Sequence, residues 1–524
     1  MKNNGICDNK MSFAECELAI LRMQVDNAQK KMAKRVVNAP EIKKIIAIVE
    51  EFLKKKQLVC YGGISINALL PEDDKIYDED IDLPDYDFFS SNALEDAKEL
   101  ADIYYKKGYT EVEAKAGQHH GTFKVYVNFL GVADITSLPK ELFQTIKSKS
   151  IKVNGILYTD PNFLRMGMYL ELERPSGDTD RWEKVLKRLT LINKYYPLNV
   201  EHCKTIEFQQ EMENKDKSDE IYNTVKNTLI SQGVVFFGGY AISQYSQYMP
   251  KALQKKVHRI PDFDVLAHDP KKTAELVQER LKDIHIKNVK IIPHSAVGDI
   301  VPEHLEIRVG NDTVVFLYKP VACHSYNVIM INGKKVRIAT IDTMLSFYLA
   351  FLYADRKYYN TARILCMSKF LFDVQQQNRL EQKGLLKRFS ILCYGHQDSR
   401  EEMRAKKAEK YKELKDKKNN KEFDEWFLNY KPGQKTITVT KSKPKAKSIS
   451  SSISPSSSST PSPSSSSTSS PSSSSNSRSN SGSQTSSRTK TNSGSQSRSN
   501  SGSSSKSKTK KKHKRKKSKT RRNK

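Results

Sequence analysis

The chain has 524 residues, of which 37% are hydrophobic and 28% are charged, and its formal net charge is +29 at pH 7. Residues 441–524 contain 21 Lys and Arg residues and no Asp or Glu, so residues 1–440 carry a net charge of only +8. The longest apolar run, residues 345–354, is too short for a membrane span, which needs about 18 or more apolar residues. The N-terminus lacks an apolar signal core, and we expect a soluble, intracellular protein of several domains.

Cysteine usage points to a reducing compartment. The chain has seven cysteines, an odd number, and no two of them are spaced as Cys-x-x-Cys. This pattern argues against a disulfide framework and against a Cys-rich zinc site. The cysteines are Cys7, Cys16, Cys60, Cys203, Cys323, Cys366 and Cys393.

The first half of the chain mixes helical and strand patterns. Apolar residues recur at steps of three and four in residues 41–57, which predicts an amphipathic helix. A short apolar strand, residues 58–61, leads to Gly62-Gly63 and to a further helix at residues 65–70. The same criteria predict helices at residues 11–36, 92–107, 162–174 and 181–196, and strands at 85–89, 123–130 and 132–135.

The order of elements in the first half is repeated in the second half. A helix at residues 220–232, an apolar strand at 234–237, Gly238-Gly239 and a strand at 261–266 repeat the earlier order. Both halves continue from the Gly pair to Pro-Asp-aromatic-Asp at nearly the same distance. An internal repeat of this kind predicts a duplicated fold.

We therefore predict an α+β protein with two tandem domains, each a mixed sheet flanked by helices. An apolar helix at residues 342–354 is expected to pack against the second half, and residues 401–418 are expected to form a solvated helix. The Ser-rich tail cannot bury enough apolar surface to fold. The predicted segments are an N-terminal helical segment 1–37, domains 38–196 and 197–395, a charged helical segment 396–432 and a disordered basic tail 433–524.

The central feature is the stretch from Pro84 to Phe89. Side chains alternate across a strand, so Asp85 and Asp87 share one face. Asp134, an acid in an otherwise apolar strand, would complete a group of three carboxylates beside them. Three neighbouring carboxylates repel one another unless a cation binds between them. A pair of Mg²⁺ ions held by the three acids would support an in-line displacement at phosphorus. Asp80 and Asp82 form a competing pair, but their acidic surroundings favour a loop.

Gly62-Gly63 fits the same chemistry. A Gly pair between a strand and a helix lets backbone N–H groups approach a phosphate closely, and a helix N-terminus favours anions. Ser65 is expected either to donate to the same phosphates or to cap the helix.

These residues resemble the DNA polymerase β-like nucleotidyltransferases. More narrowly, they resemble the poly(A) polymerase catalytic subunits of large cytoplasmic DNA viruses of the mimivirus, asfarvirus and poxvirus type. The resemblance covers roughly residues 54–183 well and the second half more loosely. It rests on the strings YGGISIN from Tyr61, DYDFF from Asp85, HHGTFKV from His119, VADIT from Val132 and RMGMYLELERPSGDTDRWEKV from Arg165.

The resemblance implies Mg²⁺ or Mn²⁺ as cofactor, ATP as donor and an RNA 3′-hydroxyl as acceptor. It also implies that Asp85, Asp87 and Asp134 hold the metals. The residues it places at the triphosphate are Gly62, Gly63 and Ser65, although this Gly-Gly departs from the Gly-Ser of many cellular relatives.

Several basic residues are further candidates. Lys124 could reach a phosphate or be an exposed structural lysine. In residues 165–184, Arg165, Arg174, Arg181 and Lys184 could contact phosphate while Tyr169 or Trp182 stacks on a base. The equal alternative is an amphipathic helix with core residues Met166, Met168, Leu170 and Leu172. His119 and His120 are expected in a loop and not as metal ligands.

The second half departs from the first. Asp262 and Asp264 match the Asp pair, but aligning Phe123 with Leu305 places Leu317 or its neighbour Phe316 opposite Asp134. Without a third carboxylate, this half is expected to keep the fold, lack catalysis and serve RNA binding or assembly.

The predicted function is template-independent addition of AMP from ATP to mRNA 3′ ends. Alternatives are a uridylyl or oligoadenylate transferase and a non-catalytic RNA-binding scaffold. Expected partners are the RNA 3′ end, ATP, and either a second copy or a separate processivity subunit, with no membrane. The viral resemblance implies action in the host cytoplasm or viral factory, with packaging into the virion left open. Residues 506–524, with thirteen Lys and Arg, are expected to bind RNA nonspecifically, or to serve as a nuclear-type address or a solubilising end.

Overall fold

The computed structural model describes residues 6–8, 10–78, 80–198, 203, 212, 217–254, 263–418 and 420–434. Residues 1–438 fall into one compact unit. The predicted tail lies outside the described residues, apart from its first two positions. Among the described helices, none combines the length and the apolar character that crossing a membrane requires.

The first sheet has eight strands in the order β16-β3-β4-β5-β2-β1-β7-β6. Helices α2 (Pro40–Lys56) and α4 (Ala93–Lys106) pack on it and on each other. The strands are β1 Val59–Cys60, β2 Tyr86–Ser90, β3 Val112–Ala116, β4 Thr122–Val127, β5 Leu130–Ser137, β6 Ile151–Val153, β7 Ile156–Tyr158 and β16 Asn429–Tyr430.

The second sheet also has eight strands, in the order β10-β11-β12-β9-β8-β14-β13-β15. Helices α8 (Ser218–Ser231) and α11 (Pro270–Asp283) pack on it in the same way. The strands are β8 Val235–Phe236, β9 Phe263–Leu266, β10 Val289–His294, β11 His304–Val309, β12 Asp312–Tyr318, β13 His324–Ile331, β14 Lys334–Ala339 and β15 Cys393–Tyr394.

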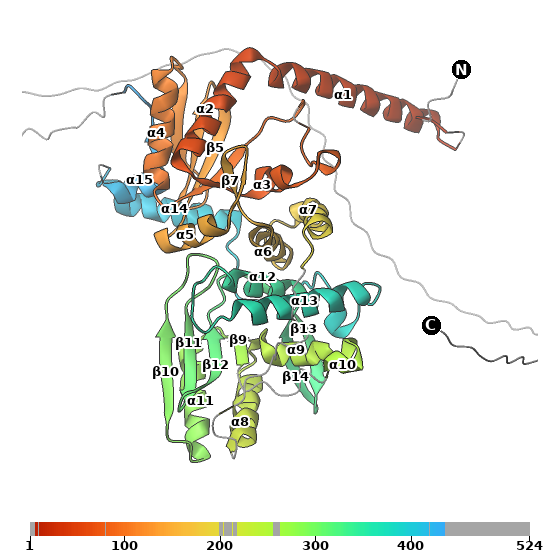
Figure 1. Ribbon diagram of the computed structural model, residues 1–524, viewed down its shortest axis with the longest axis vertical. Coiled ribbons are helices and arrows are strands. Elements are labelled where there is room, and N and C mark those ends of the chain that lie inside the picture. Colours follow the sequence, from red (N-terminus) through yellow and green to blue (C-terminus); the bar gives the residue numbers. More distant parts are fainter. Residues whose placement is uncertain are drawn as a thin grey trace, which may run out of the picture. The chain divides into compact units, whose positions relative to one another are not determined.

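The two sheets have the same connectivity, which confirms the predicted duplication. In the first, β2 is antiparallel to β1 and parallel to β5, and β1 is parallel to β7. In the second, β9 is antiparallel to β8 and parallel to β12, and β8 is parallel to β14. The fold is thus α+β with two mixed sheets flanked by helices (Figure 1). The remaining helices are α1 Phe13–Val37, α3 Gly62–Leu69, α5 Lys140–Lys149, α6 Pro161–Leu172, α7 Trp182–Tyr195, α9 Gly239–Tyr245, α10 Lys251–Gln254, α12 Ile341–Phe351, α13 Thr361–Gln377, α14 Arg400–Leu414 and α15 Lys421–Phe427.

Helix α2 illustrates how the local sequence sets these elements. Its first residue is Pro40, whose fixed φ suits a helix start, and the residue after its end, Gln57, adopts a left-handed conformation with φ 51°. Its buried side chains recur at steps of three and four and form one face against the sheet. They are Ile45, Ile48, Val49, Phe52 and Leu53.

Two equivalent helices join the halves. Helix α6 follows β7 in the first half, α12 follows β14 in the second, and the two pack directly against each other (Figure 1). The predicted helix at residues 342–354 therefore does pack against the second half, through α13, but its other face covers α6. This second contact explains why α12 is buried all round, with every residue from Ile341 to Phe351 buried.

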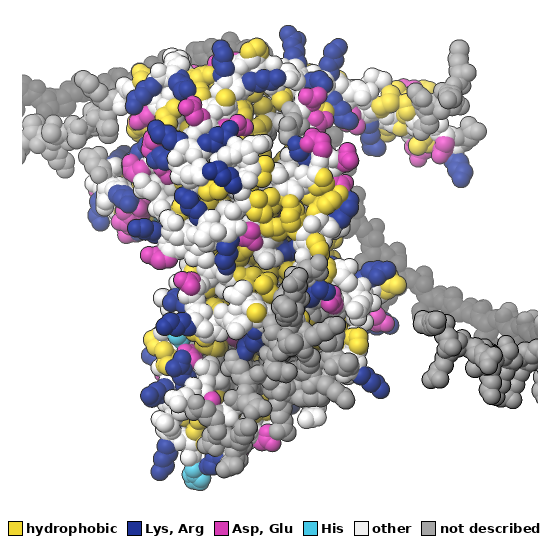
Figure 2. All heavy atoms as spheres, in the orientation of Figure 1, with side chains coloured by type: hydrophobic (Ala, Val, Ile, Leu, Met, Phe, Trp, Pro, Cys, Tyr) yellow, Lys and Arg dark blue, Asp and Glu magenta, His cyan; other side chains and the backbone are white. Residues whose placement is uncertain are grey.

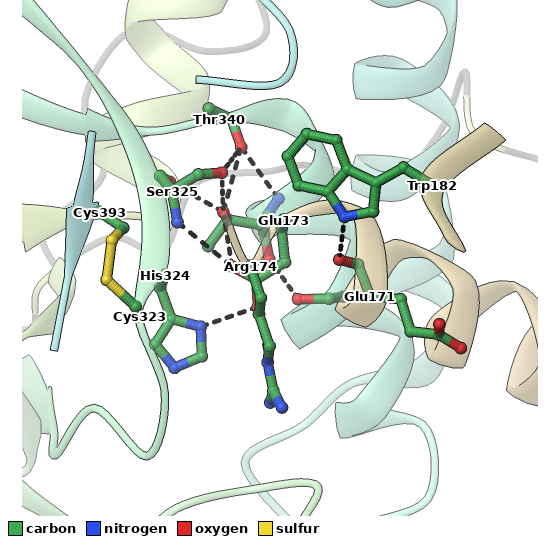
Figure 3. A network of polar contacts seen from close by, with 11 residues as sticks. Glu171, Glu173, Arg174, Trp182, Cys323, His324, Ser325, Thr340 and Cys393 are labelled. Atoms are coloured by element: carbon green, nitrogen blue, oxygen red, sulfur yellow. Dashed lines mark hydrogen bonds and ion pairs between the residues drawn. A yellow bond between two sulfur atoms is a disulfide. The ribbon is translucent and has the colours of Figure 1, made fainter. Parts of the chain in front are cut away.

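A buried carboxylate strengthens this junction. Glu173, at the C-terminal end of α6, is fully buried and accepts hydrogen bonds from His324 Nδ1 at 2.8 Å, Thr343 Oγ1 at 3.2 Å and the Ser325 N–H at 3.3 Å. All three donors belong to the second half, and Figure 3 shows His324 and Ser325 pointing at Glu173. The halves are thus linked by a paired charge as well as by apolar packing.

The sequence argued against a disulfide framework, and this prediction is wrong for six of the seven cysteines. Disulfides join Cys7 to Cys16, Cys203 to Cys366 and Cys323 to Cys393, and only Cys60 is free, in the core. Two of these pairs are 163 and 70 positions apart in the sequence. Tertiary folding brings their Cα atoms to 5.4 and 5.1 Å, which spacing in the sequence cannot reveal.

The C-terminal segment returns to the first sheet. The predicted solvated helix is α14, mostly exposed, with Leu414 as its buried residue. After α15, strand β16 pairs antiparallel with β3. Lys98 Nζ of α4 forms an ion pair with Asp424 Oδ2 at 2.9 Å. The Trp426 ring packs on the His120 ring, with centroids 4.3 Å apart. The described chain therefore ends on the half that contains the three predicted carboxylates.

Candidate active site

Three predicted carboxylates meet at the centre of the first sheet. The parallel register of β2 and β5 sets Asp87 beside Asp134, and the antiparallel register of β4 and β5 sets Lys124 on the other side of Asp134. Asp85 lies just before β2, two positions from Asp87 and thus on the same face. One carboxylate oxygen from each of Asp85, Asp87 and Asp134 lies within 4.8 Å of the others.

The other face of β2 fixes this strand in the core. Tyr86 and Phe88 alternate with the acids and are 4% and 0% exposed. The Tyr86 hydroxyl donates to Glu50 Oε1 of α2 at 2.7 Å. Because neighbouring side chains of a strand point to opposite faces, burial of these two aromatic residues directs the carboxylates outward.

The carboxylates disfavour one another's charge. Burial, then the charges of Asp85 and Asp134, raises the pKa of Asp87 to about 7. Burial and the charge of Asp134 also raise the pKa of Asp85. Lys124 forms an ion pair with Asp134 and lowers both pKa values, but one ammonium group cannot balance three acids.

This arrangement fits a divalent cation. The donors are all carboxylate oxygens, which Mg²⁺ and Mn²⁺ prefer, and they converge within metal-ligating reach. Because burial and the neighbouring carboxylates raise the pKa of Asp87, a bound divalent cation would offset the cost of its charged form. Asp80 and Asp82 do not join the group, because Asp80 pairs with Lys34 and Asp82 accepts the Asp78 N–H.

The Gly pair lies against the same site. Gly62 opens α3 with φ +69°, and a Cβ there would lie 3.0 Å from Asp87 Oδ2. A Cβ on Gly63 would lie 2.1 Å from the Tyr77 hydroxyl, so neither position accepts a side chain without movement. The N–H groups at the start of α3 are therefore next to the carboxylates, where they can bind an anion.

Ser65 points elsewhere. Its side chain is fully buried, and its hydroxyl hydrogen-bonds with Thr159 Oγ1 at 3.1 Å and lies 3.4 Å from the Thr159 carbonyl oxygen. This contact ties α3 to the end of β7. The hydroxyl is used for an interior contact, so the geometry favours the Gly62 and Gly63 backbone, not Ser65, as the phosphate-binding group.

The basic candidates divide into two groups. Arg181 is half-exposed, 3.5 Å from Glu171 Oε2, and close enough to Asp87 to lower its pKa. Lys184 is exposed on α7, and no hydrogen bond or ion pair within the described residues involves it. Arg165, in contrast, is buried and donates to Asn162 Oδ1 and Asn193 Oδ1 at 2.6 and 2.7 Å.

The suggested phosphate contact of Arg165 is therefore wrong, because a buried guanidinium with internal partners cannot reach a substrate. The suggested base stacking by Tyr169 is wrong for the same reason, since its ring is fully buried. The alternative reading of α6 as a core helix holds for Met166, Met168 and Leu172, all of which are buried.

Sequence reasoning missed two residues near the Gly pair. Tyr61 stacks on Phe89 with ring centroids 4.0 Å apart, and its hydroxyl lies 2.9 Å from Thr136 Oγ1 in β5. Arg188 donates to the Tyr77 hydroxyl at 2.8 Å and so supports the ring that covers Gly63. The Arg188 contact spans 111 positions, and no local signal reveals it.

The second half lacks the third acid. Its parallel register pairs Asp264 of β9 with Phe316 of β12, in the relationship that Asp87 has to Asp134. The prediction that an apolar residue replaces the third carboxylate is thus confirmed, and of the two candidates, Leu317 and Phe316, the register selects Phe316. Asp262 lies outside the described residues.

The sequence matches the family model "Poly(A) polymerase catalytic subunit" over residues 47–178. It is 40% identical over 179 residues to a protein of African swine fever virus (isolate Tick/Malawi/Lil 20-1/1983) named as a poly(A) polymerase catalytic subunit. It is 34% identical over 162 residues to a protein of Acanthamoeba polyphaga mimivirus with the same name. These matches cover 33% and 30% of this chain and only 37% and 27% of the two relatives.

The similarity of fold extends further than the similarity of sequence. The crystal structure of the Megavirus polyadenylate synthase superposes with a TM-score of 0.67 at 20% identity, covering 79% of this chain and 86% of that one. At this identity the superposition establishes the fold alone. The sequence match contains all three carboxylates and the Gly pair. Residues 47–178 thus resemble the poly(A) polymerase catalytic subunits of large DNA viruses, and the match covers 37% or less of those relatives' length.

Proposed function

We propose that this chain is a template-independent polynucleotide adenylyltransferase that adds AMP from ATP to RNA 3′ ends, forming a poly(A) tail. The observation that carries the proposal is the convergence of Asp85, Asp87 and Asp134 beside the Gly62-Gly63 turn. The resemblance of residues 47–178 to the family supports ATP as donor and an RNA 3′ end as acceptor, and the three acids form a site suited to phosphoryl chemistry.

The chain's own residues have distinct tasks in this reaction. Asp85, Asp87 and Asp134 would hold two divalent cations. Bound Mg²⁺ or Mn²⁺ would lower the pKa of the attacking 3′-hydroxyl and balance charge on the phosphate oxygens. The N–H groups of Gly62 and Gly63 would bind the triphosphate at the start of α3, because a helix N-terminus carries partial positive charge.

The basic residues would complete the site. Lys124 orients Asp134 through their ion pair and lies directly opposite it in the register of β4 and β5. Arg181 is near enough to affect Asp87 and would bind a phosphate oxygen of ATP or of the primer, and exposed Lys184 would add a second such contact. The second half, without a third acid, would support assembly or RNA binding and not catalysis.

Partners and location follow from the relatives. Their name, catalytic subunit, favours a further subunit, so we propose that either a processivity subunit or a second copy takes part. The viral relatives favour action in the host cytoplasm or the viral factory. We also propose that the segments divide as 1–37, 38–196, 197–395, 396–432 and 433–524.

A labelled-nucleotide experiment tests the proposal. Purified protein is incubated with Mg²⁺ or Mn²⁺, an RNA primer with a free 3′-hydroxyl, and each labelled nucleoside triphosphate in turn. Extension with ATP alone is expected. Preferential use of UTP would identify a uridylyl transferase, and products only a few adenylates long would identify an oligoadenylate enzyme. No incorporation with any nucleotide would favour a non-catalytic RNA-binding scaffold.

A further inference from the structure

A pocket of the second half occupies the place that the three carboxylates have in the first half. It lies over Asp264 of β9 and Phe316 of β12, which hold the register positions of Asp87 and Asp134. Asp264 leaves no room for a Cβ at Gly238, just as Asp87 crowds the first glycine of the other Gly pair. The empty space of the pocket is about 530 Å³, its solvent-open mouth included.

This pocket has lost the donors that a metal ion needs. Among its described lining residues, Asp264 is the only acid, and Phe316 stands where the third carboxylate would be. Glu306 lies opposite Phe316 in β11 but is fully buried. It accepts a hydrogen bond from Arg308 Nε at 2.6 Å and lies 2.8 Å from His294 Nε2, so its charge is balanced within the protein. A ligand of this pocket is therefore held by other means.

Aromatic rings line the space instead. The rings of Phe316 and Tyr358 stack with centroids 5.1 Å apart, and the Tyr358 hydroxyl lies 2.9 Å from His304 Nε2. The Tyr359 hydroxyl lies 2.8 Å from that of Tyr318. Tyr358 and Tyr359 are half-buried and face the pocket. Rings that are held in place in this way offer a surface on which a nucleic-acid base stacks.

The wall of the pocket formed by α12 and α13 adds a positive charge. Arg363, in the first turn of α13, lines the pocket and lies 12 positions after Phe351, the last residue of α12. Lys184 lies 12 positions after Leu172, the last residue of the equivalent α6. A basic residue thus recurs at the same place in both halves, and a guanidinium is well suited to bind phosphate. In Figure 2, hydrophobic side chains, in yellow, gather in the region of α6 and α12, so the surroundings of this charge are apolar.

We propose that this pocket binds a purine nucleotide. The base enters the pocket and stacks against the ring of Tyr358, and Arg363 binds the phosphate at the mouth. A purine is favoured because its two fused rings cover more aromatic surface than the single ring of a pyrimidine. The nucleotide is either free or one unit of an RNA strand, since both present the same base and phosphate. This inference goes beyond the proposed adenylyl transfer and requires neither its metal ions nor its three acids.

Isothermal titration calorimetry of the full chain tests the pocket, with AMP as the probe. EDTA removes divalent cations, and about 0.2 M salt weakens nonspecific binding to the basic tail. AMP should bind with a Kd below about 1 mM and at least about threefold more tightly than UMP, which carries the same charge. Tyr358→Leu removes the ring and should weaken AMP binding at least about tenfold, whereas Tyr358→Phe keeps the ring and should stay within about threefold of the parent. Asp134→Asn should bind AMP as the parent does, because it changes the other half.

A second pair of variants tests the phosphate contact. Arg363→Gln should weaken AMP binding at least about tenfold, but the binding of adenosine, which has no phosphate, by less than about threefold. Arg379 is exposed beyond the other end of α13, so Arg379→Gln removes the same charge and should change AMP affinity less than about twofold. Circular dichroism of each variant verifies that the fold is retained.

An oligoadenylate of about five nucleotides distinguishes the two sources of the nucleotide. If it displaces AMP at concentrations at least about tenfold lower than unlabelled AMP does, the pocket holds one unit of an RNA strand. Weaker displacement identifies a free nucleotide. The proposal is overturned if AMP does not bind up to about 10 mM, if UMP binds as tightly as AMP, or if AMP binding is unchanged in Tyr358→Leu or in Arg363→Gln.

Discussion

The side chain of Asp87 lies between two other carboxylates and is largely buried, so its charged form is costly without a cation. In the unfolded chain its pKa would be about 3.9. In the folded chain it is about 7, so between these values the unfolded state releases a proton that the folded state keeps. Asp87 therefore reduces the free energy of unfolding as pH rises through this window, and the full penalty is present above pH 7.

Asp87→Asn should remove this penalty. In EDTA we expect the free energies of unfolding of the variant and the parent to differ little near pH 4. At pH 8 the free energy of unfolding of the variant should be higher by about 1–3 kcal/mol. Thermal unfolding at several pH values measures the difference. Asp416→Asn, at an exposed carboxylate, is the matched control. Saturating Mg²⁺ should stabilise the parent and narrow the gap; equal stability of Asp87→Asn and parent at pH 8 in EDTA would contradict the prediction.

Asp134 and Asp264 offer a matched comparison between the two halves. Asp134→Asn removes a carboxylate from the group of three and should reduce adenylate incorporation at least about 100-fold. Asp264→Asn changes a strand acid whose neighbour is Phe316, and incorporation should stay within about threefold of the parent. Primer extension with labelled ATP measures both. An equal loss in the two variants, with folding intact, would mean that the second half takes part in catalysis.

At the scale of elements, the junction of α6 with the second half contains one buried carboxylate, Glu173. Glu173→Ala would leave His324 Nδ1 without its acceptor, at a cost of about 1–3 kcal/mol. The Ser325 N–H would keep the backbone oxygen of residue 173 at 3.0 Å, and Thr343 Oγ1 would keep the Ser325 carbonyl oxygen at 2.8 Å. Glu173→Gln keeps a side-chain acceptor and should cost less. Chemical denaturation measures both changes.

Glu171→Gln is the control for this junction. Glu171 lies two residues earlier, and its ion pair with half-exposed Arg181 should be worth less than about 1 kcal/mol. If Glu173→Ala unfolded at the same denaturant concentration as Glu171→Gln, the polar link between the halves would be energetically unimportant.

The elements that sequence could predict are those with a strong local period. Helices α1, α2, α4, α6, α7 and α8 and strands β1, β2, β4 and β5 lie within a few residues of their predicted bounds. Strands β6, β7 and β16 were not predicted, because two or three residues cannot show a period, and the equally short β1 was found from the apolar run that precedes the Gly pair. β7 and β16 are placed by pairing with β1 and β3, far along the chain, and β6 pairs with the adjacent β7.

At the scale of the whole molecule, the described chain ends at β16 on the first sheet, and the basic residues follow. Deleting residues 441–524 removes 21 positive charges from the chain. RNA affinity should fall markedly in 50 mM salt and much less in 200 mM salt, because counterion release drives such binding. The extension rate at saturating RNA should stay within about threefold of the parent, since the three carboxylates remain. Fluorescence anisotropy and primer extension measure the two effects, and a large loss of the saturated rate would contradict the prediction.

Local geometry explains what the sequence by itself determined about this protein. The alternation of a strand places Asp85 and Asp87 on one face, and the repeated Gly pair and Asp pair reveal two related halves. Alignment likewise shows that Leu317 or Phe316 replaces the third acid, and the strand register then selects Phe316. Each of these features depends on backbone periods of a few residues, which any stretch of sequence expresses directly.

Only the tertiary structure decided which distant groups meet. The register of β2 and β5 brings Asp134 beside Asp87, and packing turns the Ser65 hydroxyl and the Arg165 guanidinium inward. Folding also pairs Cys203 with Cys366 and sets α12 against α6. Such contacts depend on how whole sheets and helices bury their apolar faces, and this is a property of the complete chain because no short segment can bury its apolar face alone.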